Sequence, residues 1–173
     1  MAGHDGGCGI RTSVWEGGMA MNDFAAQWLN QLLEATDEYL QEGTKAALLA
    51  ACSGTCTAHW AAEARAIREE AGYDADPRML LAAFCRVLPG GGPEVSVEET
   101  SSGDWAIGWR FAPRACPCPL TEITQNPILC RCGTGHVKGM LEALLGRPLA
   151  VTLEGSRLRG DPTCSYRIRC ADV

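Results

Sequence analysis

Cysteine is the residue type in this chain whose spacing most directly predicts chemistry. Thiolates close together in sequence hold soft metal ions, with tetrahedral zinc as the simplest case, and an iron–sulfur cluster also needs only cysteine ligands. Five of the six cysteines of the second half could surround one or two ions. The sequence therefore predicts a metal–thiolate site formed by Cys116, Cys118, Cys130, Cys132 and Cys164. The alternative is a structural zinc site that holds the long loop at residues 112–130 in place and does no chemistry.

The two C-x-C pairs favour this interpretation. In a regular strand, alternate side chains lie about 7 Å apart, so both sulfurs reach one ion only in irregular structure. The prolines that follow Cys116 and Cys118 keep that pair out of regular structure. Cys130 and Cys132 stand just ahead of an expected helix, where the helix dipole lowers a thiol's pKa.

A second group of reactive side chains is expected on one helix. Cys52, Cys56, His59 and Glu63 fall within an arc of roughly 60° at 3.6 residues per turn, and the apolar residues beside them place that arc near the buried stripe. These four residues extend too far along the helix axis to bind one ion together. Cys52, Cys56 and His59 are instead candidates for the reacting group of an enzyme. The alternative is that both cysteines are small core residues.

The helix that follows Cys132 opens with Gly133, Gly135 and His136. It lacks the phosphate-loop pattern and no Rossmann strand precedes it, so we expect no nucleotide site. The glycines are also explained by close helix–sheet packing. His136 is a candidate acid, base or ligand contact. An apolar ligand pocket is expected beside the thiols, lined by aromatic side chains that are equally good core residues, namely Trp60, Phe84, Trp105 and Trp109.

The periodicity of apolar residues predicts an α+β fold. Helices are expected over about 22–41, from Thr44 as N-cap to about 72, from Asp76 with Leu80, Leu81, Phe84 and Val87 on its apolar face, and over 133–145. Strands are expected over 94–100, 105–111, 149–153 and 165–170. N-terminal helices should pack on an antiparallel sheet of two hairpins joined by a crossover helix. We divide the chain into a flexible lead-in (1–20), a helical segment (21–90) and an α+β segment (91–173), together one compact domain.

Charge and composition restrict the partners. A formal charge of −6 and an isoelectric point near 5.1 argue against nucleic acid and anionic membranes. No apolar run approaches the roughly 20 residues of a membrane span, and the first residues lack the pattern of a secretory signal. A cytoplasmic protein with reduced thiols is expected, binding a small molecule and possible as a homodimer.

The last third of the chain resembles a known family. The residues that carry the resemblance run from Cys130-x-Cys132 through Gly146-x-Pro148 and Glu154 to Arg159-Gly160-Asp161-x-x-Cys164-x-Tyr166-x-Ile168. This run is similar to the 4-vinyl-reductase-like domain and to small cysteine-rich bacterial proteins related to it and to the aminothiazoline-carboxylate hydrolases. The resemblance covers about 40 residues well and about 120 loosely.

The resemblance implies a specific site. Some members are aromatic-compound sensors in which a zinc ion, held by cysteines and a glutamate, supports a buried small-molecule pocket. Cys132, Glu154 and Cys164 would match zinc ligands. The sensors' further cysteine is missing, because Ser156 and Leu158 occupy that stretch. The chain as given contains no ATPase or DNA-binding module, so the resemblance implies a binding domain and not a whole regulator.

Three functions follow from these patterns. The first is a metal–thiolate protein that acts on or senses a small organic ligand, slightly favoured to be an enzyme. The second is a hydrolase of small cyclic C=N or sulfur compounds, in which Cys52, Cys56 or His59 reacts or a metal activates water. The third is a metal carrier or iron–sulfur redox protein.

Overall fold

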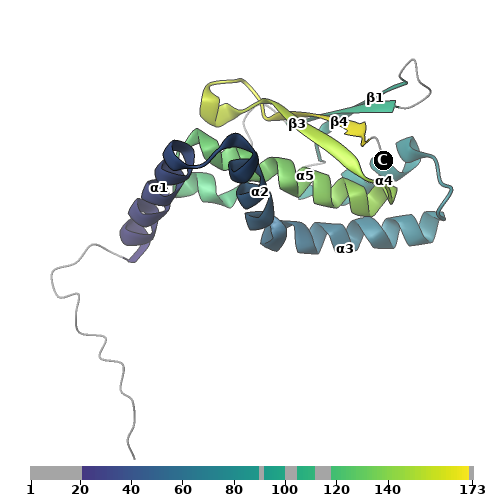
Figure 1. Cartoon of the computed structure of the whole chain (residues 1–173). Helices are drawn as coiled ribbons and strands as arrows, with labels where there is room; N and C mark the ends of the chain where they lie inside the picture. The colour runs from purple at the N-terminus through teal and green to yellow at the C-terminus, as the bar shows by residue number, and fades with distance from the viewer. Residues whose placement is uncertain (1–20, 90–91, 100–104, 112–117, 172–173) are drawn as a thin grey trace, which may run out of the picture.

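The computed structural model describes residues 21–89, 92–99, 105–111 and 118–171 (Figure 1). Its first half holds four helices, α1 (Met21–Tyr39), α2 (Glu42–Cys52), α3 (Gly54–Ala71) and α4 (Pro77–Val87). The strands are β1 (Glu94–Glu99), β2 (Trp105–Arg110), β3 (Leu149–Gly155) and β4 (Ser165–Cys170), with α5 (Cys130–Leu145) between the hairpins. Short 3-10 turns in the described part of the chain include η2 (Pro119–Glu122), η3 (Pro127–Leu129) and η4 (Arg157–Arg159).

The four strands form one antiparallel sheet with the order β1-β2-β4-β3. Each hairpin contributes two neighbouring strands, and the hairpins join where β2 pairs with β4, with Trp109 opposite Tyr166. α5 lies between the sheet and α3 (Figure 1). The predicted α+β class, with two hairpins and a crossover helix, is confirmed.

The local rules that predicted α4 hold in the structure. The Asp76 side chain accepts a hydrogen bond from the backbone N–H of Arg78 at 2.8 Å, and Pro77 fills the first helical position. Leu80, Leu81 and Phe84 are buried against the sheet and α5. Val87, the fourth apolar residue of the pattern, is 47% exposed.

The predicted helix from Thr44 to about residue 72 is wrong, because two helices occupy this stretch. α2 begins at Glu42, and the chain bends at Ser53, whose backbone ends α2 and begins α3. The Ser53 hydroxyl donates to the carbonyl of Ala50 and so competes with the helical hydrogen-bond ladder. Serine followed by glycine is a weak point in a helix, since both residues favour other conformations.

α5 also begins earlier than predicted, at Cys130 and not at Gly133. Cys130 and Cys132 therefore lie in the first turn of the helix and not in an irregular segment ahead of it. Glycines allow this helix to pack closely on its neighbours. A Cβ atom at Gly133 would lie 2.2 Å from the Tyr166 hydroxyl, and one at Gly135 would lie 2.6 Å from the Cα atom of Ala50. The predicted helix–sheet packing is confirmed for Gly133, whereas Gly135 packs against α2.

The buried apolar residues form two clusters. The larger cluster, which we call the sheet cluster, lies between the sheet, α4 and α5, and contains Phe84, Ile107, Trp109, Leu141 and Ile168 among others. The smaller, the N-terminal cluster, joins α1, α2 and η3 through Leu33, Leu49, Ile128 and Leu129.

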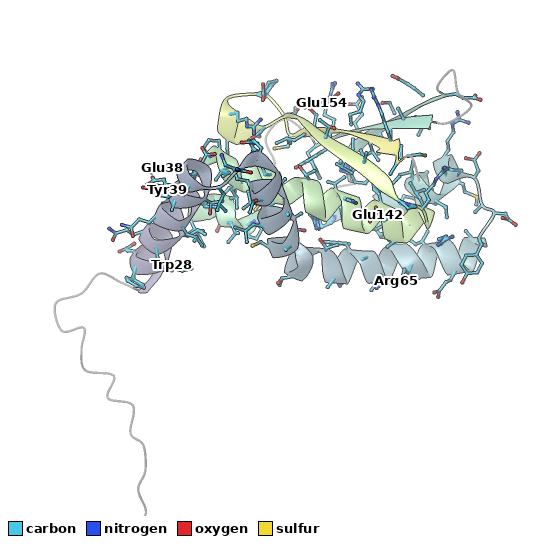
Figure 2. The ribbon with its side chains drawn as sticks, in the orientation of Figure 1. Trp28, Glu38, Tyr39, Arg65, Glu142 and Glu154 are labelled. Carbon is cyan, nitrogen blue, oxygen red and sulfur yellow. The ribbon has the colours of Figure 1, made fainter. Side chains whose placement is uncertain are left out.

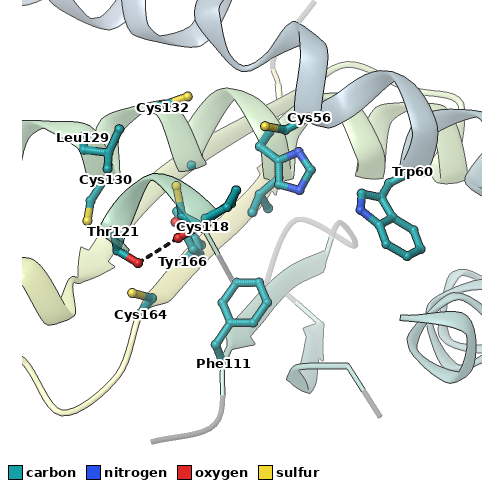
Figure 3. Close-up of a pocket in the computed structure, with 14 residues that line it drawn as sticks. Cys56, Trp60, Phe111, Cys118, Thr121, Leu129, Cys130, Cys132, Cys164 and Tyr166 are labelled. Carbon is teal, nitrogen blue, oxygen red and sulfur yellow. Dashed lines mark hydrogen bonds between the residues drawn. The ribbon is translucent and has the colours of Figure 1, made fainter. Parts of the chain in front are cut away.

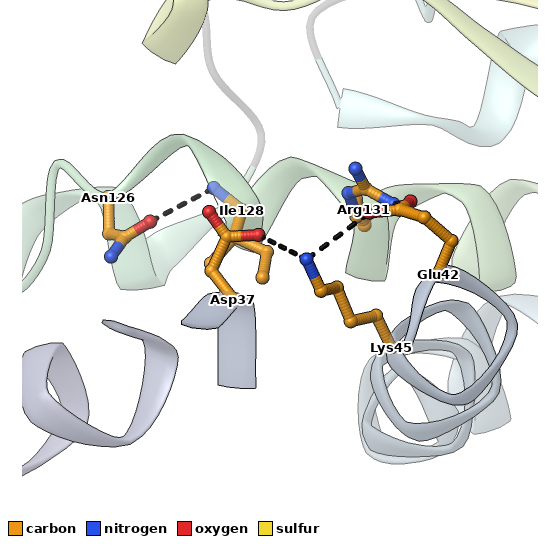
Figure 4. A network of polar contacts seen from close by, with 6 residues as sticks. All are labelled: Asp37, Glu42, Lys45, Asn126, Ile128 and Arg131. Atoms are coloured by element: carbon orange, nitrogen blue, oxygen red, sulfur yellow. Dashed lines mark hydrogen bonds and ion pairs between the residues drawn. The ribbon is translucent and has the colours of Figure 1, made fainter. Parts of the chain in front are cut away.

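Lys45 joins α1 to α2 beside the N-terminal cluster, and Glu42 extends the network to α5 (Figure 4). Its ammonium group lies 2.7 Å from the carboxylate of Asp37 on α1 and 3.2 Å from that of Glu42 on α2. Glu42 also pairs with Arg131 on α5. Lys45 is only 7% exposed, so the pair with Asp37 closes over a largely buried cation. Within the described residues, no helix combines the length and the apolar character that a membrane crossing requires.

Candidate functional site

A cavity of about 300 Å³ lies beside the amino-terminal turns of α5 (Figure 3). Its wall is mostly apolar side chains and thiols, with few groups able to form hydrogen bonds. The lining residues are Cys56, Trp60, Phe111, Cys118, Pro119, Thr121, Leu129, Cys130, Cys132, Gly133, His136, Val137, Cys164 and Tyr166.

The cavity lies where the two hydrophobic clusters meet. Phe111, Val137 and Tyr166 belong to the sheet cluster or pack against it, whereas Leu129 and Cys132 belong to or pack against the N-terminal cluster. The two groups of side chains line the same space (Figure 3). Five separate stretches of chain therefore enclose it, and their positions depend on the whole fold.

His136 is the principal polar group of the wall. Its Nδ1 atom lies 3.2 Å from the hydroxyl of Thr57 on α3. Thr57 donates its single hydroxyl hydrogen to the carbonyl of Ser53 at 2.8 Å, so we assign it as acceptor and Nδ1 as donor. Nε2 is then the unprotonated nitrogen, able to accept a hydrogen bond. Burial lowers the pKa of His136, which keeps the ring neutral at pH 7.

Thr121 adds no free donor to the wall. Its hydroxyl donates at 2.7 Å to the carbonyl of Cys118, as the dashed line in Figure 3 marks. Among the described residues of the wall, the imidazole of His136 therefore offers an unprotonated ring nitrogen, and Tyr166 adds a phenolic hydroxyl. An apolar space with a small number of polar groups on its wall is the usual composition of a site for a small organic molecule.

Five thiols line the cavity, contributed by Cys56, Cys118, Cys130, Cys132 and Cys164. Burial, with smaller contributions from nearby Cys118, Cys56 and Cys52, raises the pKa of Cys132 to about 11. The expectation that the start of α5 favours a thiolate is therefore wrong for Cys132, because desolvation of the charged form outweighs the helix dipole. At neutral pH this side chain is an uncharged thiol.

The predicted aromatic lining is only partly correct. Trp60 lines the cavity, but Phe84 and Trp109 are 0% and 1% exposed and belong to the sheet cluster. The two rings lie 6.5 Å apart, with Phe84 packing from α4 onto the sheet. The prediction that Trp109 contacts a ligand is therefore wrong, because its side chain is part of the core. The side chain of Trp105 lies outside the described residues.

The helical group Cys52, Cys56, His59 and Glu63 was expected near the buried stripe, and this is wrong. All four are exposed. The break at Ser53 changes the direction of the helix between Cys52 and Cys56, so the arc computed for one continuous helix does not apply. Cys56 alone among them lines the cavity, whereas His59 contacts the Trp60 ring edge to face.

The predicted metal ligands do not converge among the described residues. No three His, Cys, Asp or Glu side chains of that part of the chain lie close enough to hold a metal ion. Glu154 is exposed on β3, and its carboxylate accepts a hydrogen bond from Arg167 on β4 at 2.7 Å. Cys116 lies outside the described residues. The thiols fit zinc by donor type, but their described positions do not form a site for it.

Several lining residues were not predicted as site residues from the sequence. Phe111 and Tyr166 reach the cavity from the ends of β2 and β4, with ring centroids 6.4 Å apart. Thr57 supports His136 from α3. Tyr166 stands in an alternating apolar–polar strand, a pattern that signals burial but not contact with a cavity.

The fold and the cavity define a class, an α+β domain that encloses a small apolar space between its helices and one end of its sheet. No family model and no curated protein matches the chain. Among solved structures, the phenol-responsive sensory domain of the transcription activator PoxR, determined with phenol, matches with a TM-score of 0.50 and 15% identity, over 84% of this chain and 73% of that one. At this identity the likeness shows a shared fold.

A second solved structure is a looser match. It is a trafficking protein particle complex subunit 3 from Naegleria fowleri, covalently bound to palmitic acid. The TM-score is 0.44 with 14% identity, and the match covers 87% of this chain and 95% of that one.

Proposed function

We propose that this chain binds a small, uncharged aromatic molecule with a hydroxyl group in the cysteine-lined cavity. The observation that carries the proposal is the cavity itself, about 300 Å³ of apolar space with His136 on its wall. That volume lies at the lower end of ligand pockets and suits a molecule of one or two rings. Likeness in fold to a sensory domain solved with phenol supports the same class of ligand.

The polarity of the wall favours a hydrogen-bond donor over an anion. His136 is neutral, and its Nε2 atom accepts hydrogen bonds, so a phenolic O–H satisfies it. A carboxylate would enter a largely apolar space in which no described lining residue is a cation that could pair with it, which is costly. The expected order of affinity is therefore phenol above toluene, and toluene above benzoate.

Calorimetric titration of the full chain with phenol, toluene and benzoate tests the proposal. The wild type should bind phenol at least about tenfold more tightly than toluene, as a hydrogen bond in a desolvated site allows. His136→Leu should remove this preference while toluene still binds. Failure of all three compounds to bind, or an equal preference in the His136→Leu variant, would contradict it.

The second candidate function is a hydrolase of small cyclic C=N compounds. The observation that favours it is the presence of Cys56 and His136 on the same cavity wall, from α3 and α5. A thiol with a neutral imidazole in reach of the same bound molecule is the arrangement of a nucleophile and its base. Cys52 and His59, the other predicted reacting groups, do not line the cavity.

A pair of variants separates this function from simple binding. In assays with aminothiazoline carboxylates, Cys56→Ser should abolish turnover and Cys52→Ser should leave it unchanged. Cys52 is the matched control, because it is an exposed cysteine four residues away. If the wild type binds phenol but turns over no aminothiazoline carboxylate, the hydrolase function is contradicted and only the binding function stands.

The zinc site and the relation to the 4-vinyl-reductase-like group remain separate proposals. They are supported by the donor chemistry of five thiols around one cavity and by the run from Cys130 to Ile168. Elemental analysis of anaerobically purified protein tests the metal. About one zinc ion per chain that is lost in Cys132→Ser supports it, and no metal in the wild type contradicts it.

A further inference from the structure

A groove of about 420 Å³ lies on the opposite side of α5 from the cavity. One face of α5 lines it, because Arg131, Thr134, Gly135 and Lys138 fall within an arc of roughly 100° around the helix axis. The α5 residues that line the cavity are centred roughly 170° away. The other lining residues of the groove come from α2, β3 and η4, namely Ala46, Ala50, Val151, Thr152, Leu153 and Arg159.

The free edge of β3 faces this groove. β3 is the last strand in the sheet order, so β4 pairs with one side of it and no described strand pairs with the other. Successive side chains of a strand point to opposite faces of the sheet. Three consecutive residues, 151–153, therefore line one groove only where that groove meets the edge of the strand. Backbone groups of β3 are thus part of the groove.

Two residues direct their backbone groups into the groove. The N–H of Ala171 donates to the carbonyl of Pro148 at 3.1 Å, which makes these residues a hydrogen-bonded pair of the β3–β4 ladder. Hydrogen-bonded pairs alternate along an antiparallel ladder, so every second residue of β3 bonds to β4. The N–H and C=O groups of Val151 and Leu153 then point the other way, toward the free edge.

A contact between Glu142 and Leu149 agrees with this register and aligns α5 with β3. The N–H of Leu149, also an outward group, donates to the Glu142 carboxylate at 2.9 Å. The two elements run in opposite directions from this contact. At about 1.5 Å per helical residue and about 3.4 Å per strand residue, Lys138 lies near Val151 and the first turn of α5 near Leu153. The open edge therefore begins at Val151.

Three cations line the groove, although the whole chain carries a formal charge of −6. Arg131 pairs with Glu42, and the Lys138 ammonium group lies 3.7 Å from the Glu142 carboxylate in a half-exposed pair that is weak. The guanidinium of Arg159 forms no ion pair or hydrogen bond with the described part of the chain. No described lining residue is acidic, so the groove presents positive charge.

The acidic residue of β3 lies on the other face of the sheet. Figure 2 shows Glu154 on the face away from α5, and its carboxylate accepts a hydrogen bond from Arg167 at 2.7 Å. Val151 and Leu153 face α5 instead, and both pack against the sheet cluster. Side chains directly opposite one another on paired strands share a face. A strand added at this edge would therefore direct the residues opposite Val151 and Leu153 toward α5.

We propose that the groove binds an extended acidic peptide of another protein, which adds a strand beside β3. The peptide backbone pairs with the outward N–H and C=O groups of Val151 and Leu153. The peptide residues opposite these two lie about 7 Å apart and point toward α5. A Glu-x-Glu sequence then directs one carboxylate toward Lys138 and the other toward Arg131 and Arg159, where charge-assisted hydrogen bonds form.

The backbone of the edge favours a strand over a small anion. It offers carbonyl oxygens as well as N–H groups, and carbonyl oxygens repel an oxyanion, whereas a peptide donates to them. In strand addition the backbone bonds supply affinity and the side-chain contacts supply specificity. The three cations therefore select acidic sequences. Because the groove and the cavity lie on opposite sides of α5, the inference is independent of the proposed ligand.

Fluorescence anisotropy of dye-labelled peptides with the full chain tests the proposal. The wild type should bind Thr-Glu-Thr-Glu-Thr at least about tenfold more tightly than Thr-Gln-Thr-Gln-Thr, and more weakly as salt increases. Arg159→Glu should weaken binding of the glutamate peptide at least about tenfold without lowering the melting temperature. Arg157→Glu is the matched control, because Arg157 is an exposed arginine of the same turn that does not line the groove. Equal weakening by both variants, or equal affinity for both peptides, would overturn the assignment.

A backbone-modified peptide tests the added strand. Thr-Glu-Thr-Glu-Thr with N-methylated amides keeps both carboxylates but cannot donate to the outward carbonyls of β3, so its binding should be lost. Equal binding of the methylated peptide would overturn the strand and leave a simple anion site. A wild type that binds no glutamate peptide would overturn the proposal, whether or not the cavity binds phenol.

Discussion

Thr57 on α3 and His136 on α5 are joined by a 3.2 Å contact between the threonine hydroxyl and Nδ1 of the imidazole. The residues are 79 positions apart in sequence, and the contact fixes both the orientation and the proton of a ring on the cavity wall. Because Thr57 is itself held by the Ser53 carbonyl, the bend between α2 and α3 determines which nitrogen of His136 remains to accept a hydrogen bond.

The lowered pKa of His136 predicts how binding and stability depend on pH. Phenol affinity should be constant from pH 8 to about the usual imidazole value of 6.5 and fall only below it, since the protonated ring cannot accept a hydrogen bond. Stability should also fall below about pH 6.5, because the unfolded chain takes up the proton first, and level off once the folded chain is protonated. Titrations and melts of wild type and His136→Leu measure both effects. The variant should lose this pH dependence, and persistence of the dependence would assign it to another group.

Gly133→Ala should damage the cavity. The added Cβ atom would lie 2.2 Å from the Tyr166 hydroxyl, so the ring must move from its place under α5. Overpacking of this kind costs about 1–3 kcal/mol, and phenol affinity should fall with it. Gly43→Ala is the control, because nothing lies within 4 Å of the added atom there. Thermal melts and titrations should show the control unchanged or slightly more stable, as alanine favours a helix by about 0.5–1 kcal/mol.

Ligand should protect one of two neighbouring cysteines. Cys52 and Cys56 are both exposed, but only Cys56 lines the cavity. Alkylation followed by mass spectrometry should therefore show that phenol slows modification of Cys56 and leaves Cys52 unaffected. Cys132 should react slowly at pH 8 with or without ligand, because its pKa is raised to about 11. Equal protection of Cys52 and Cys56 would place the ligand elsewhere.

Lys45→Met should loosen α1 without unfolding the sheet. The variant keeps the length of the side chain but loses the ion pairs with Asp37 and Glu42. Hydrogen exchange should become faster in α1 and stay unchanged in α5 and β4. The pair with Lys45 lowers the pKa of Asp37, so its contribution to the stability of the wild type is present above the usual aspartate pKa and disappears as the pH falls through the lowered value. Uniform acceleration along the chain would contradict a local role.

Sequence patterns predicted the elements of this fold more reliably than the neighbours of its reactive side chains. The helix after Pro77 and the two hairpins follow from local rules of capping and alternation, which act within a few residues. The break at Ser53 was missed because the apolar periodicity continues on both sides of it. That one error placed Cys52, His59 and Glu63 near the buried stripe, when they are exposed.

The site depends on contacts between distant segments, which local patterns do not encode. Glu154 was expected among the zinc ligands, but the sheet order places β3 beside β4, where Arg167 binds its carboxylate. From the sequence, Trp60 and Trp109 were equally good candidates for the cavity wall and for the core. The pairing of β2 between β1 and β4 buries Trp109 in the sheet cluster, whereas Trp60 lies at the cavity.

The position of the cavity between the two hydrophobic clusters has a consequence for cooperativity. Without a ligand, the side chains of the two clusters do not fill the space between them, so we expect α1, α2 and η3 to open at lower temperature than the sheet and α5. A molecule in the cavity contacts both clusters and should make them unfold as one unit. Occupancy of a small internal space would then control how firmly the N-terminal helices are held, and with them the surface that α1 presents to solution.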